Sequence, residues 1–399
     1  MSKPRLLFIS PRFLFPIDSG GKIRTTGILR EMKGGAFDIT LASPSPPASN
    51  FGEDMASIAD RWFYWSTTDG WLRKLQRFTH LFSSFPFPVA GDASKGGSEL
   101  IANLLTDEID VCVFDFVHAA VLAPGKSSVP SVIFTHNVEA EIFARHAKVA
   151  TNPLLKHLWQ RQWQKMLSFE SRNLQRFDRV VAVSERDKAY FETDYGLTNV
   201  HTIPTGVDLN FFPYNYQPQA GKVVFTGSMD WLANQDGIGF FLNDVWPRIT
   251  AKHSGASMCV VGRNPPEQLK QRSAIHRESW HFTGFVDDVR PYIHQASAYV
   301  IPLRVGGGTR LKVFEAMASG CPVVSTSIGV EGLDLTEGIH YINAETPDEF
   351  AAATLRLLND PSLGQKLSRA ARDFVEKYAS NSFVARQFED ICTAALASE

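Results

Sequence analysis

The sequence is poor in cysteine, and this scarcity excludes several kinds of site. Its 399 residues contain four cysteines, which are far apart and form no CxxC pair. That spacing argues against a thiolate metal cluster. Each cysteine lies in an apolar run, so we expect buried free thiols in a reducing cytosol. The four are Cys112, Cys259, Cys321 and Cys392.

Long hydrophobic runs and an excess of one charge are also missing. No window approaches the roughly 18 apolar residues of a membrane-spanning helix. The opening run Leu6–Ser10 is too short for a signal peptide. The net charge is −2, so no overall attraction to nucleic acid follows. We therefore expect a soluble cytoplasmic protein with no nucleic-acid partner, and a peripheral contact with the inner face of a membrane stays open.

The sequence does contain a regular alternation of short apolar runs with longer amphipathic stretches, which is typical of βαβ units and parallel sheets. Its length favours two domains, and the lack of a fixed-period repeat excludes a solenoid. The predicted fold class is therefore α/β, with two doubly wound sheets of about six strands each and a join near Pro204–Pro213. The predicted strands are Arg5–Ser10, Phe37–Ala42, Val111–Phe114, Val132–Thr135, Arg179–Val183 and Val200–Ile203, then Lys222–Thr226, Ser257–Val261, Trp280–Phe282, Ala298–Leu303, Pro322–Thr326 and His340–Ile342.

Other segments depart from this alternation. Arg61–Pro88 is dense in aromatic and basic residues, and we expect it to form an acceptor wall or a patch that lies on a membrane. Leu154–Phe177 is predicted to be a long helix whose aromatic residues Trp159, Trp163 and Phe169 belong to the core. Amphipathic helices are predicted over Ser362–Tyr378 and Ser380–Ala397.

The strongest candidate site lies between Ala298 and Thr326. The apolar strand Tyr299–Leu303 leads into the loop Gly306-Gly307-Gly308-Thr309, and a helix over Arg310–Ser319 follows. Glycines let the backbone approach an anion, and a helix start offers unpaired N–H groups and a positive dipole end. Arg310 and Lys312 add cations, and Glu315, one turn beyond Lys312, can accept hydrogen bonds from a pair of sugar hydroxyls. Pyrophosphate beside a ribose would satisfy these groups.

The plainer interpretation is a glycine-rich loop that only caps a helix with a solvated charged face. The position of this loop favours function, because open α/β sheets bind ligands at the carboxyl ends of their strands.

At these residues the chain resembles a known family. The segment PLRVGGGTRLKVFEAMASGCPVVST resembles the donor-site signature of the retaining glycosyltransferases of family 4, which have the GT-B fold. HTIPTGVDLNFF, at His201–Phe212, is similar to that family's interdomain crossing, and FTGFVDDVRPYIHQASAYVIPL to its approach to the donor loop. The resemblance covers nearly the whole second half, and in the first half it is carried by FISPRF, DSGGKIRT, FTHNVE and RVVAVSE.

The resemblance implies two Rossmann-like domains that face each other across a cleft. Residues 1–208 would bind the acceptor, residues 209–379 would bind the nucleotide sugar, and a helix over 380–399 would return to the first domain. Transfer would retain the anomeric configuration, with front-face attack in which the leaving phosphate helps to deprotonate the acceptor. Such a reaction needs stabilisation of leaving-group charge more than a protein nucleophile.

No metal or other cofactor is required by that scheme. No DxD motif occurs in the setting expected of a metal–diphosphate clamp, because Asp287-Asp288 is only an adjacent pair before a helix. The implied substrates are a nucleotide diphosphate sugar of UDP or GDP type and a glycan or lipid-linked glycan, in polysaccharide or glycolipid synthesis.

The resemblance also implies a set of site residues. Arg310 and Lys312 in the second domain and His136 in the first are the expected catalytic groups. Donor contacts are expected from Gly20, Gly21, Gly227, Arg263, Phe285, Val286, Gly307, Gly308, Thr309, Arg310, Leu311 and Glu315. Acceptor contacts are expected from Lys22, Arg24, Asp115, His118, Asn137 and Glu139.

Two departures from the family pattern limit what carries over. Gly307 stands where many relatives have a glutamate that touches the transferred sugar, so the sugar is not predicted. Ser228, Asp230 and Asn234 stand where relatives carry an arginine and a lysine after the first strand of the second domain. We expect Arg310 and Lys312 to supply the missing positive charge from the other side.

Two other functions compete with transfer. A nucleotide-sugar epimerase of the same fold would need acid and base groups across the cleft, and the first domain shows no dense carboxylate cluster. A non-catalytic donor-binding or assembly protein is favoured by the glycine at position 307. A donor hydrolysis assay separates the three functions.

Overall fold

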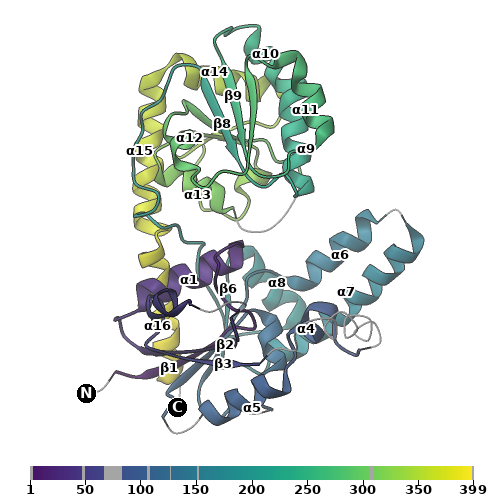
Figure 1. Ribbon diagram of the computed structural model, residues 1–399, viewed down its shortest axis with the longest axis vertical. Helices are drawn as coiled ribbons and strands as arrows, with labels where there is room; N and C mark the ends of the chain where they lie inside the picture. Colours follow the sequence, from purple (N-terminus) through teal and green to yellow (C-terminus); the bar gives the residue numbers. More distant parts are fainter. Residues whose placement is uncertain are drawn as a thin grey trace. The chain divides into compact units, whose positions relative to one another are not determined.

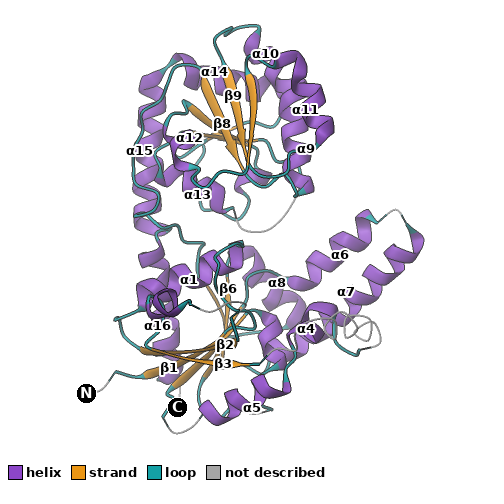
Figure 2. Ribbon diagram, in the orientation of Figure 1, coloured by secondary structure: helices purple, strands orange, loops and turns teal. Residues whose placement is uncertain are grey.

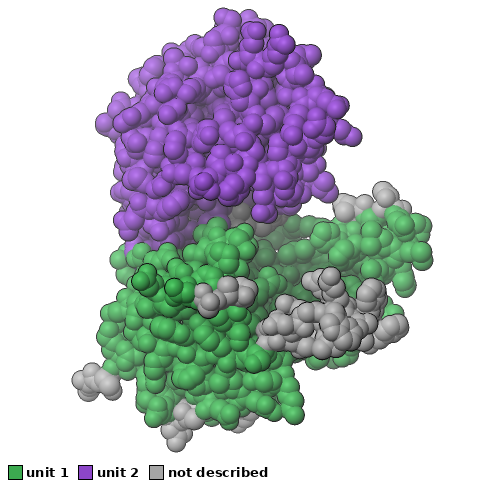
Figure 3. All heavy atoms as spheres, viewed as in Figure 1, with its two compact units in different colours: residues 1–204, 384–399 green, residues 205–383 purple. Residues whose placement is uncertain are grey.

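A computed structural model of the chain describes residues 3–46, 50–66, 83–105, 108–125, 127–150, 152–305 and 310–397. The chain forms two compact units. Unit 1 contains the residues up to Pro204 and those from Val384 onward, and unit 2 contains Thr205–Phe383. Figure 3 colours the two units separately. The division falls slightly before the boundary at residue 208 expected from the sequence.

Unit 1 is built on a parallel sheet of seven strands in the order β3-β2-β1-β4-β5-β6-β7. The central strand β4 has the sequence VCVFD and is buried at every position, as expected for a parallel strand covered on both faces. The strands are β1 Arg5–Ile9, β2 Asp38–Pro44, β3 Arg61–Trp65, β4 Val111–Asp115, β5 Ser131–Phe134, β6 Arg179–Ala182 and β7 Val200–Thr202.

Helices cover both faces of this sheet (Figure 2). They are α1 Gly20–Met32, α2 Gly52–Ala56, α4 Phe87–Asp92, α5 Lys95–Leu104, the 3-10 helix η1 Val117–Val121, α6 Glu139–Val149, α7 Pro153–Leu174, α8 Glu185–Tyr195 and α16 Asn381–Leu396. Local signals explain where several of them begin. Asn152 caps α7 by accepting hydrogen bonds from the N–H groups of Leu154 and Leu155, and Pro153 occupies its first position.

The edge strand β3 corrects a prediction. Arg61–Trp65 was expected to belong to an aromatic and basic segment outside the regular alternation, whereas these residues pair with Thr40–Pro44 of β2. Aromatic residues favour strands, but only Trp65 is buried, so the usual apolar alternation is absent. Most of the predicted segment, including Trp71, Phe78, Phe82 and the cations Arg73, Lys74 and Arg77, lies outside the described residues.

The long helix α7 confirms one prediction and overturns part of another. It begins at Pro153 and ends at Leu174, close to the predicted bounds. Phe169 is buried as expected, and Trp159 packs partly buried against the core. The prediction for Trp163 was wrong, because 36% of this side chain is exposed.

Unit 2 repeats the architecture with six parallel strands in the order β10-β9-β8-β11-β12-β13. All six had been predicted from the sequence. They are β8 Lys222–Thr226, β9 Ser257–Val261, β10 Trp280–Gly284, β11 Ala298–Ile301, β12 Val323–Ser325 and β13 Ile342–Asn343. Figure 1 labels β8 and β9 of this sheet.

The helices of unit 2 are α9 Leu232–Phe240, α10 Trp246–Thr250, α11 Glu267–Ser273, α12 Arg290–His294, α13 Leu311–Ala318, α14 Pro347–Asn359 and α15 Pro361–Tyr378. A π-helical segment, η2 Phe241–Val245, and two 3-10 helices, η3 Ala274–His276 and η4 Ile328–Val330, accompany them. Thr346 and Glu349 form a reciprocal capping box at the start of α14.

Alternate residues of each central strand in unit 2 enter two separate cores. Val223 and Phe225 belong to one cluster, and Val224, between them, belongs to the other. Successive side chains of a strand point to opposite faces, so both faces of this sheet are covered by apolar layers. This is the doubly wound arrangement predicted from the sequence.

Within the described residues, no helix is both long enough and apolar enough to cross a membrane.

Candidate active site

The carboxyl ends of β8 and β11 mark a topological switch point in unit 2. The chain leaves β8 toward β9 on one side, and β11 pairs with β8 on the other. Open α/β sheets bind ligands in the crevice outside such a point. Gly227 directly follows β8 and has a φ of +153°, a backbone conformation that favours glycine.

Lys312 of α13 reaches this point. Its Nζ donates a hydrogen bond of 3.0 Å to Oδ1 of Asn234 and lies 4.3 Å from the ring centre of Phe225. A Cβ atom on Gly227 would lie only 2.7 Å from the same Nζ, so the ammonium rests against the Gly227 backbone. Asn234 of α9 therefore holds a lysine from a different helix.

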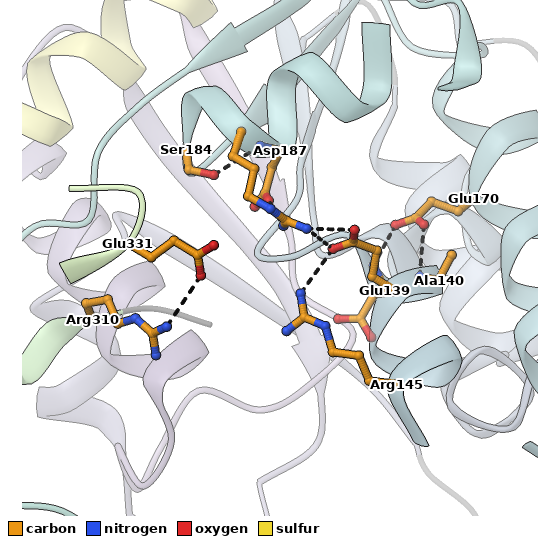
Figure 4. Close-up of polar contacts among 10 residues, drawn as sticks. Glu139, Ala140, Arg145, Glu170, Ser184, Asp187, Arg310 and Glu331 are labelled. Atoms are coloured by element: carbon orange, nitrogen blue, oxygen red, sulfur yellow. Dashed lines mark hydrogen bonds and ion pairs between the residues drawn. The ribbon is translucent and has the colours of Figure 1, made fainter. Parts of the chain in front are cut away.

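Arg310 stands directly before α13, and only 4% of it is exposed. Its Nη2 lies 3.6 Å from Oε2 of Glu331 (Figure 4). Leu311 is the first residue of the helix, one position after the start at Arg310 expected from the sequence. The predicted donor residues Gly307, Gly308 and Thr309 lie outside the described residues.

Burial shifts the titration of two charged side chains on α13 in opposite directions. It lowers the pKa of Lys312 to about 7, against the attraction of Glu315. It raises the pKa of Glu315 to about 7, against the attraction of Lys312. Desolvation disfavours the charged form of both groups, and their mutual attraction does not make up for it. Burial is thus the dominant cause of both shifts.

Arg263, expected near the nucleotide base, lies on the loop after β9. It pairs instead with Asp230 on the loop after β8, with 2.9 Å between Nε and Oδ2. Asn264 donates to the same carboxylate, and this hydrogen bond together with one from Ser228 lowers the pKa of Asp230.

Phe285 and Val286 follow the carboxyl end of β10. Phe285 is 73% exposed, whereas Val286 packs against the core of unit 2. The Phe285 ring therefore faces solvent, and Val286 is partly buried.

Unit 1 also has a switch point, and it gathers a buried polar cluster. Asp115 ends β4, and both its oxygens accept from the Thr25 hydroxyl, at 3.2 and 3.0 Å. Its Oδ1 lies 2.7 Å from Nε2 of His136, which follows β5. On the other side of the ring, Nη1 of Arg24 lies 3.1 Å from Nδ1 of His136. All four side chains are at most 3% exposed.

These contacts define the tautomer of His136. A guanidinium only donates, so Nδ1 accepts from Arg24, and Nε2 carries the proton that it donates to Asp115. Burial lowers the pKa of His136, although Asp115 acts in the opposite direction, and the ring is neutral. Phe116 stacks on the ring with 3.8 Å between centres. Both ring nitrogens of the predicted catalytic histidine are therefore already engaged.

The predicted glycine loop is the first turn of α1. The helix begins at Gly20, and a Cβ on Gly21 would lie 2.4 Å from Cζ of Phe116. Gly21 is thus required for close packing against the ring that stacks on His136. Lys22 pairs with Asp18 at 3.1 Å and donates to the Pro16 carbonyl.

His118 and Glu139 come together at the base of α6. Nε2 of His118 lies 3.7 Å from Oε2 of Glu139, and Nδ1 lies 3.3 Å from Oδ2 of Asp92. Burial opposes protonation, but the two carboxylates raise the pKa of His118 to about 9. Burial also opposes ionisation of Glu139, yet hydrogen bonding by His118 and Asn137 lowers the pKa of that carboxyl. Protonated His118 is thus a bridge between two anions.

Several members of these clusters were not predicted. Asp92, Phe116 and Glu331 carry no motif that distinguishes them along the chain, and Thr25, the last residue of the segment DSGGKIRT, was not singled out. Phe116 has a φ of +66°, rare for a non-glycine residue, and no local signal indicates it. Within the described residues, no three His, Cys, Asp or Glu side chains group closely enough to hold a metal ion.

Comparison with known proteins now decides the family. A profile of Glycosyltransferase Family 4 matches residues 20–211, and a profile of Glycosyl transferases group 1 matches residues 220–360. The chain belongs to glycosyltransferase family 4. The two matches adjoin near the division between the units, so each unit carries its own part of the family pattern.

One curated relative is phosphatidyl-myo-inositol mannosyltransferase of Mycobacterium leprae. It is 28% identical over 204 residues, which are 48% of this chain and 54% of the relative. The chain spans about half the length of the curated relatives that it matches.

Solved structures establish the GT-B fold. Sucrose-phosphate synthase of Thermosynechococcus elongatus has a TM-score of 0.70 at 15% identity and covers 100% of both chains. An Anabaena protein solved in complex with UDP has a TM-score of 0.66 at 13% identity, covering 98% of this chain and 100% of that one. The predicted fold class is confirmed.

Proposed function

We propose that this family 4 protein is a retaining glycosyltransferase that moves a sugar from a nucleotide diphosphate sugar to a glycan or lipid-linked glycan. The observation that carries the proposal is the placement of Lys312 against the Gly227 backbone at the switch point of unit 2. Family membership and the solved complex of a fold neighbour with UDP support it.

The electrostatics of this point suit a diphosphate. Among the described residues, no carboxylate lies within ion-pair distance of the Lys312 ammonium, whose hydrogen-bond partner is the neutral Asn234. A diphosphate there would supply the missing negative charge and keep the lysine protonated. Arg310, buried at the start of the same helix, would add a second cation.

In this mechanism the two cations stabilise the negative charge that develops on the leaving phosphate. The sugar is transferred with retention, through attack from the face that the leaving group departs from. Glu315 binds the ribose hydroxyls, and Phe285 and Arg263 lie near the base. Stabilisation of the phosphate charge falls to the protein's own cations, so we propose that transfer does not require a divalent ion.

In unit 1 we propose that His136 binds the transferred sugar and that Lys22, Arg24, Asp115, His118, Asn137 and Glu139 bind the acceptor. Because Arg24 and Asp115 occupy both ring nitrogens, a sugar hydroxyl reaches His136 only by replacing one of them. Arg24 is the partner that can exchange, since a hydroxyl can also donate to Nδ1.

Purified protein incubated with UDP-glucose or GDP-mannose tests the proposal. Release or transfer of sugar with retained configuration, observed by NMR and unchanged by EDTA, is the expected result. An isomerised donor would identify an epimerase. Tight binding without turnover, over a range of acceptors, would identify a non-catalytic donor-binding protein.

The lowered pKa of Lys312 gives the first prediction. Diphosphate binds the protonated lysine, so donor affinity should fall as pH rises through about 7. A nucleotide sugar is a better probe than a free nucleotide because its diphosphate has no proton to lose in this range. Lys312→Gln should weaken binding about 10-fold or more at pH 6.5 and flatten the pH profile, measured by calorimetry. Lys366→Gln, at an exposed lysine of α15, is the matched control.

A further inference from the structure

We propose that the outer end of the helical pair α6–α7 docks unit 1 onto an anionic lipid bilayer. Figure 1 shows the two helices running side by side away from the sheet of unit 1. The docking surface consists of Lys148 on α6 and of Leu154, Leu155, Lys156, Arg161 and Trp163 on α7. None of these residues belongs to the segment Arg61–Pro88, for which the sequence suggested membrane contact; the described end of that segment contacts α7 further in, where Lys165 donates to the Ser83 carbonyl.

The outer part of this helical pair carries charge of one sign. From Ile142 to Phe169 the sequence contains no Asp or Glu, although the whole chain has 42 of them and a net charge of −2. The same stretch carries five lysines and arginines, namely Arg145, Lys148, Lys156, Arg161 and Lys165. A local excess of this kind on a mildly acidic protein marks a surface that meets negative charge.

The surface also exposes large apolar side chains. Leu154 is 83% exposed, Leu155 44% and Trp163 36%. Leu154 and Leu155 lie in the first turn of α7, where the neighbours Lys156 and His157 are exposed as well. Leucine side chains beside cations are the composition of helices that insert shallowly among lipid headgroups. An acidic protein or a nucleic acid would use the cations but would not use two solvent-facing leucines.

Buried hydrogen bonds hold the two helices together at their base, so the outer end projects from an ordered part of unit 1. The fully buried Glu170 of α7 accepts hydrogen bonds from the N–H groups of Glu139 and Ala140 at the start of α6 (Figure 4). The Tyr195 hydroxyl donates to the same carboxylate at 2.8 Å. Further out, Trp159 stacks on His146 with 4.8 Å between ring centres.

The acidic group nearest the outer end is neutralised. Glu141 of α6 pairs with Arg145 at 3.2 Å and with Arg186 at 2.5 Å. Lys148, Lys156 and Arg161 form no ion pair with any side chain that the structure describes, so their charge faces solvent. Because surface cations interact with a charged membrane over about a Debye length, these three contribute most.

Sedimentation of the full chain with vesicles tests the proposal. We expect binding to vesicles that contain phosphatidylglycerol, weaker binding at 0.5 M salt, and no binding to pure phosphatidylcholine. Lys156→Glu combined with Arg161→Glu should reduce the apparent affinity roughly tenfold or more. Leu154→Asp should reduce it as well, without changing the thermal unfolding of the protein, because the side chain is exposed.

Matched variants in unit 2 are the controls. Ile275 is as exposed as Leu154, at 83%, so Ile275→Asp tests the loss of an apolar surface group elsewhere. Lys252→Glu with Lys366→Glu reverses two exposed cations. Absence of binding to anionic vesicles, or an equal loss of binding in the control variants, overturns the proposal. The proposal is also overturned if the protein forms a concentration-dependent dimer that Leu154→Asp dissociates while vesicle binding stays unchanged.

These outcomes do not depend on catalysis. Vesicle binding can succeed in a protein that transfers no sugar, and transfer to a soluble acceptor can succeed in a protein that binds no vesicle.

Discussion

At the scale of single residues, Arg24 controls the chemistry available to His136. Its guanidinium donates to Nδ1, which forces the ring proton onto Nε2 and toward Asp115. Burial lowers the pKa of Arg24 to about 10, still far above neutral pH, so the arginine stays charged. The histidine is therefore held neutral and oriented from both sides.

Replacement of Arg24 tests this arrangement of hydrogen bonds around His136. In Arg24→Met the histidine loses a neighbouring cation, so its pKa should rise, and Nδ1 should become free to take a proton. Asp115 would lose a nearby positive charge while remaining buried, which should cost roughly 3–5 kcal/mol of unfolding free energy. Nitrogen-detected NMR of the ring and thermal unfolding measure the two effects. Arg30→Met, on the exposed side of α1, should change neither.

At the scale of elements, the ends of β8 and β9 approach so closely that a side chain cannot fit between them. A Cβ built on Gly262 would lie 1.9 Å from the Gly227 carbonyl oxygen. This contact places the turn after β8 beside Lys312, so the packing of two backbone segments shapes the proposed phosphate site.

Alanine at position 262 should therefore damage both stability and binding. Gly262→Ala should destabilise unit 2 by about 1–3 kcal/mol or more, because the backbone must move. Donor binding should weaken with it, as measured by calorimetry. Gly239→Ala is the matched control. Gly239 lies inside α9, and a Cβ atom there would meet only Leu269, at an ordinary contact distance of 3.6 Å. That variant should be neutral or stabilised by up to roughly 1 kcal/mol. Equal behaviour of the two variants would contradict this account.

At the scale of the whole molecule, each unit completes its own core, but unit 1 does so with the end of the chain. Phe388 of α16 is fully buried, and its ring centre lies 5.1 Å from that of Phe134 on β5. Oε1 of Glu389 also accepts from the Ala36 N–H at 3.0 Å. The last helix is thus part of the core that supports His136, two positions beyond Phe134.

Loss of the Phe388 ring should act on unit 1 alone. Phe388→Ala removes a fully buried aromatic side chain and should lower stability by about 3–5 kcal/mol. Affinity for UDP at 25 °C should stay unchanged, since UDP lacks the sugar proposed to bind His136 and the groups proposed to hold the diphosphate belong to unit 2. Hydrogen exchange resolves the two units separately, and faster exchange is expected in β5 and β6. Arg386→Ala, at an exposed position of α16, is the control.

Local patterns predicted the parallel strands and the main helices because both depend on short-range periodicity. Buried parallel strands are continuous apolar runs, and β4 and β11 are of this kind. The edge strand β3 was missed because a half-exposed strand keeps no such run. Trp163 was placed in the core because helical spacing alone does not show which face of α7 is covered.

The candidate site likewise has features that the sequence predicts and contacts that only the tertiary structure decides. By itself the sequence determined the family, the two doubly wound sheets and the identity of the cations Arg310 and Lys312, since these follow from contiguous motifs. Only the tertiary structure decided that Lys312 rests on Gly227 beside Asn234, that Arg24 and Asp115 occupy both nitrogens of His136, and that His118 bridges Asp92 and Glu139. Each of these contacts joins residues far apart in the chain, and the packing of strands and helices, rather than any local pattern, brings them within hydrogen-bonding or ion-pair distance.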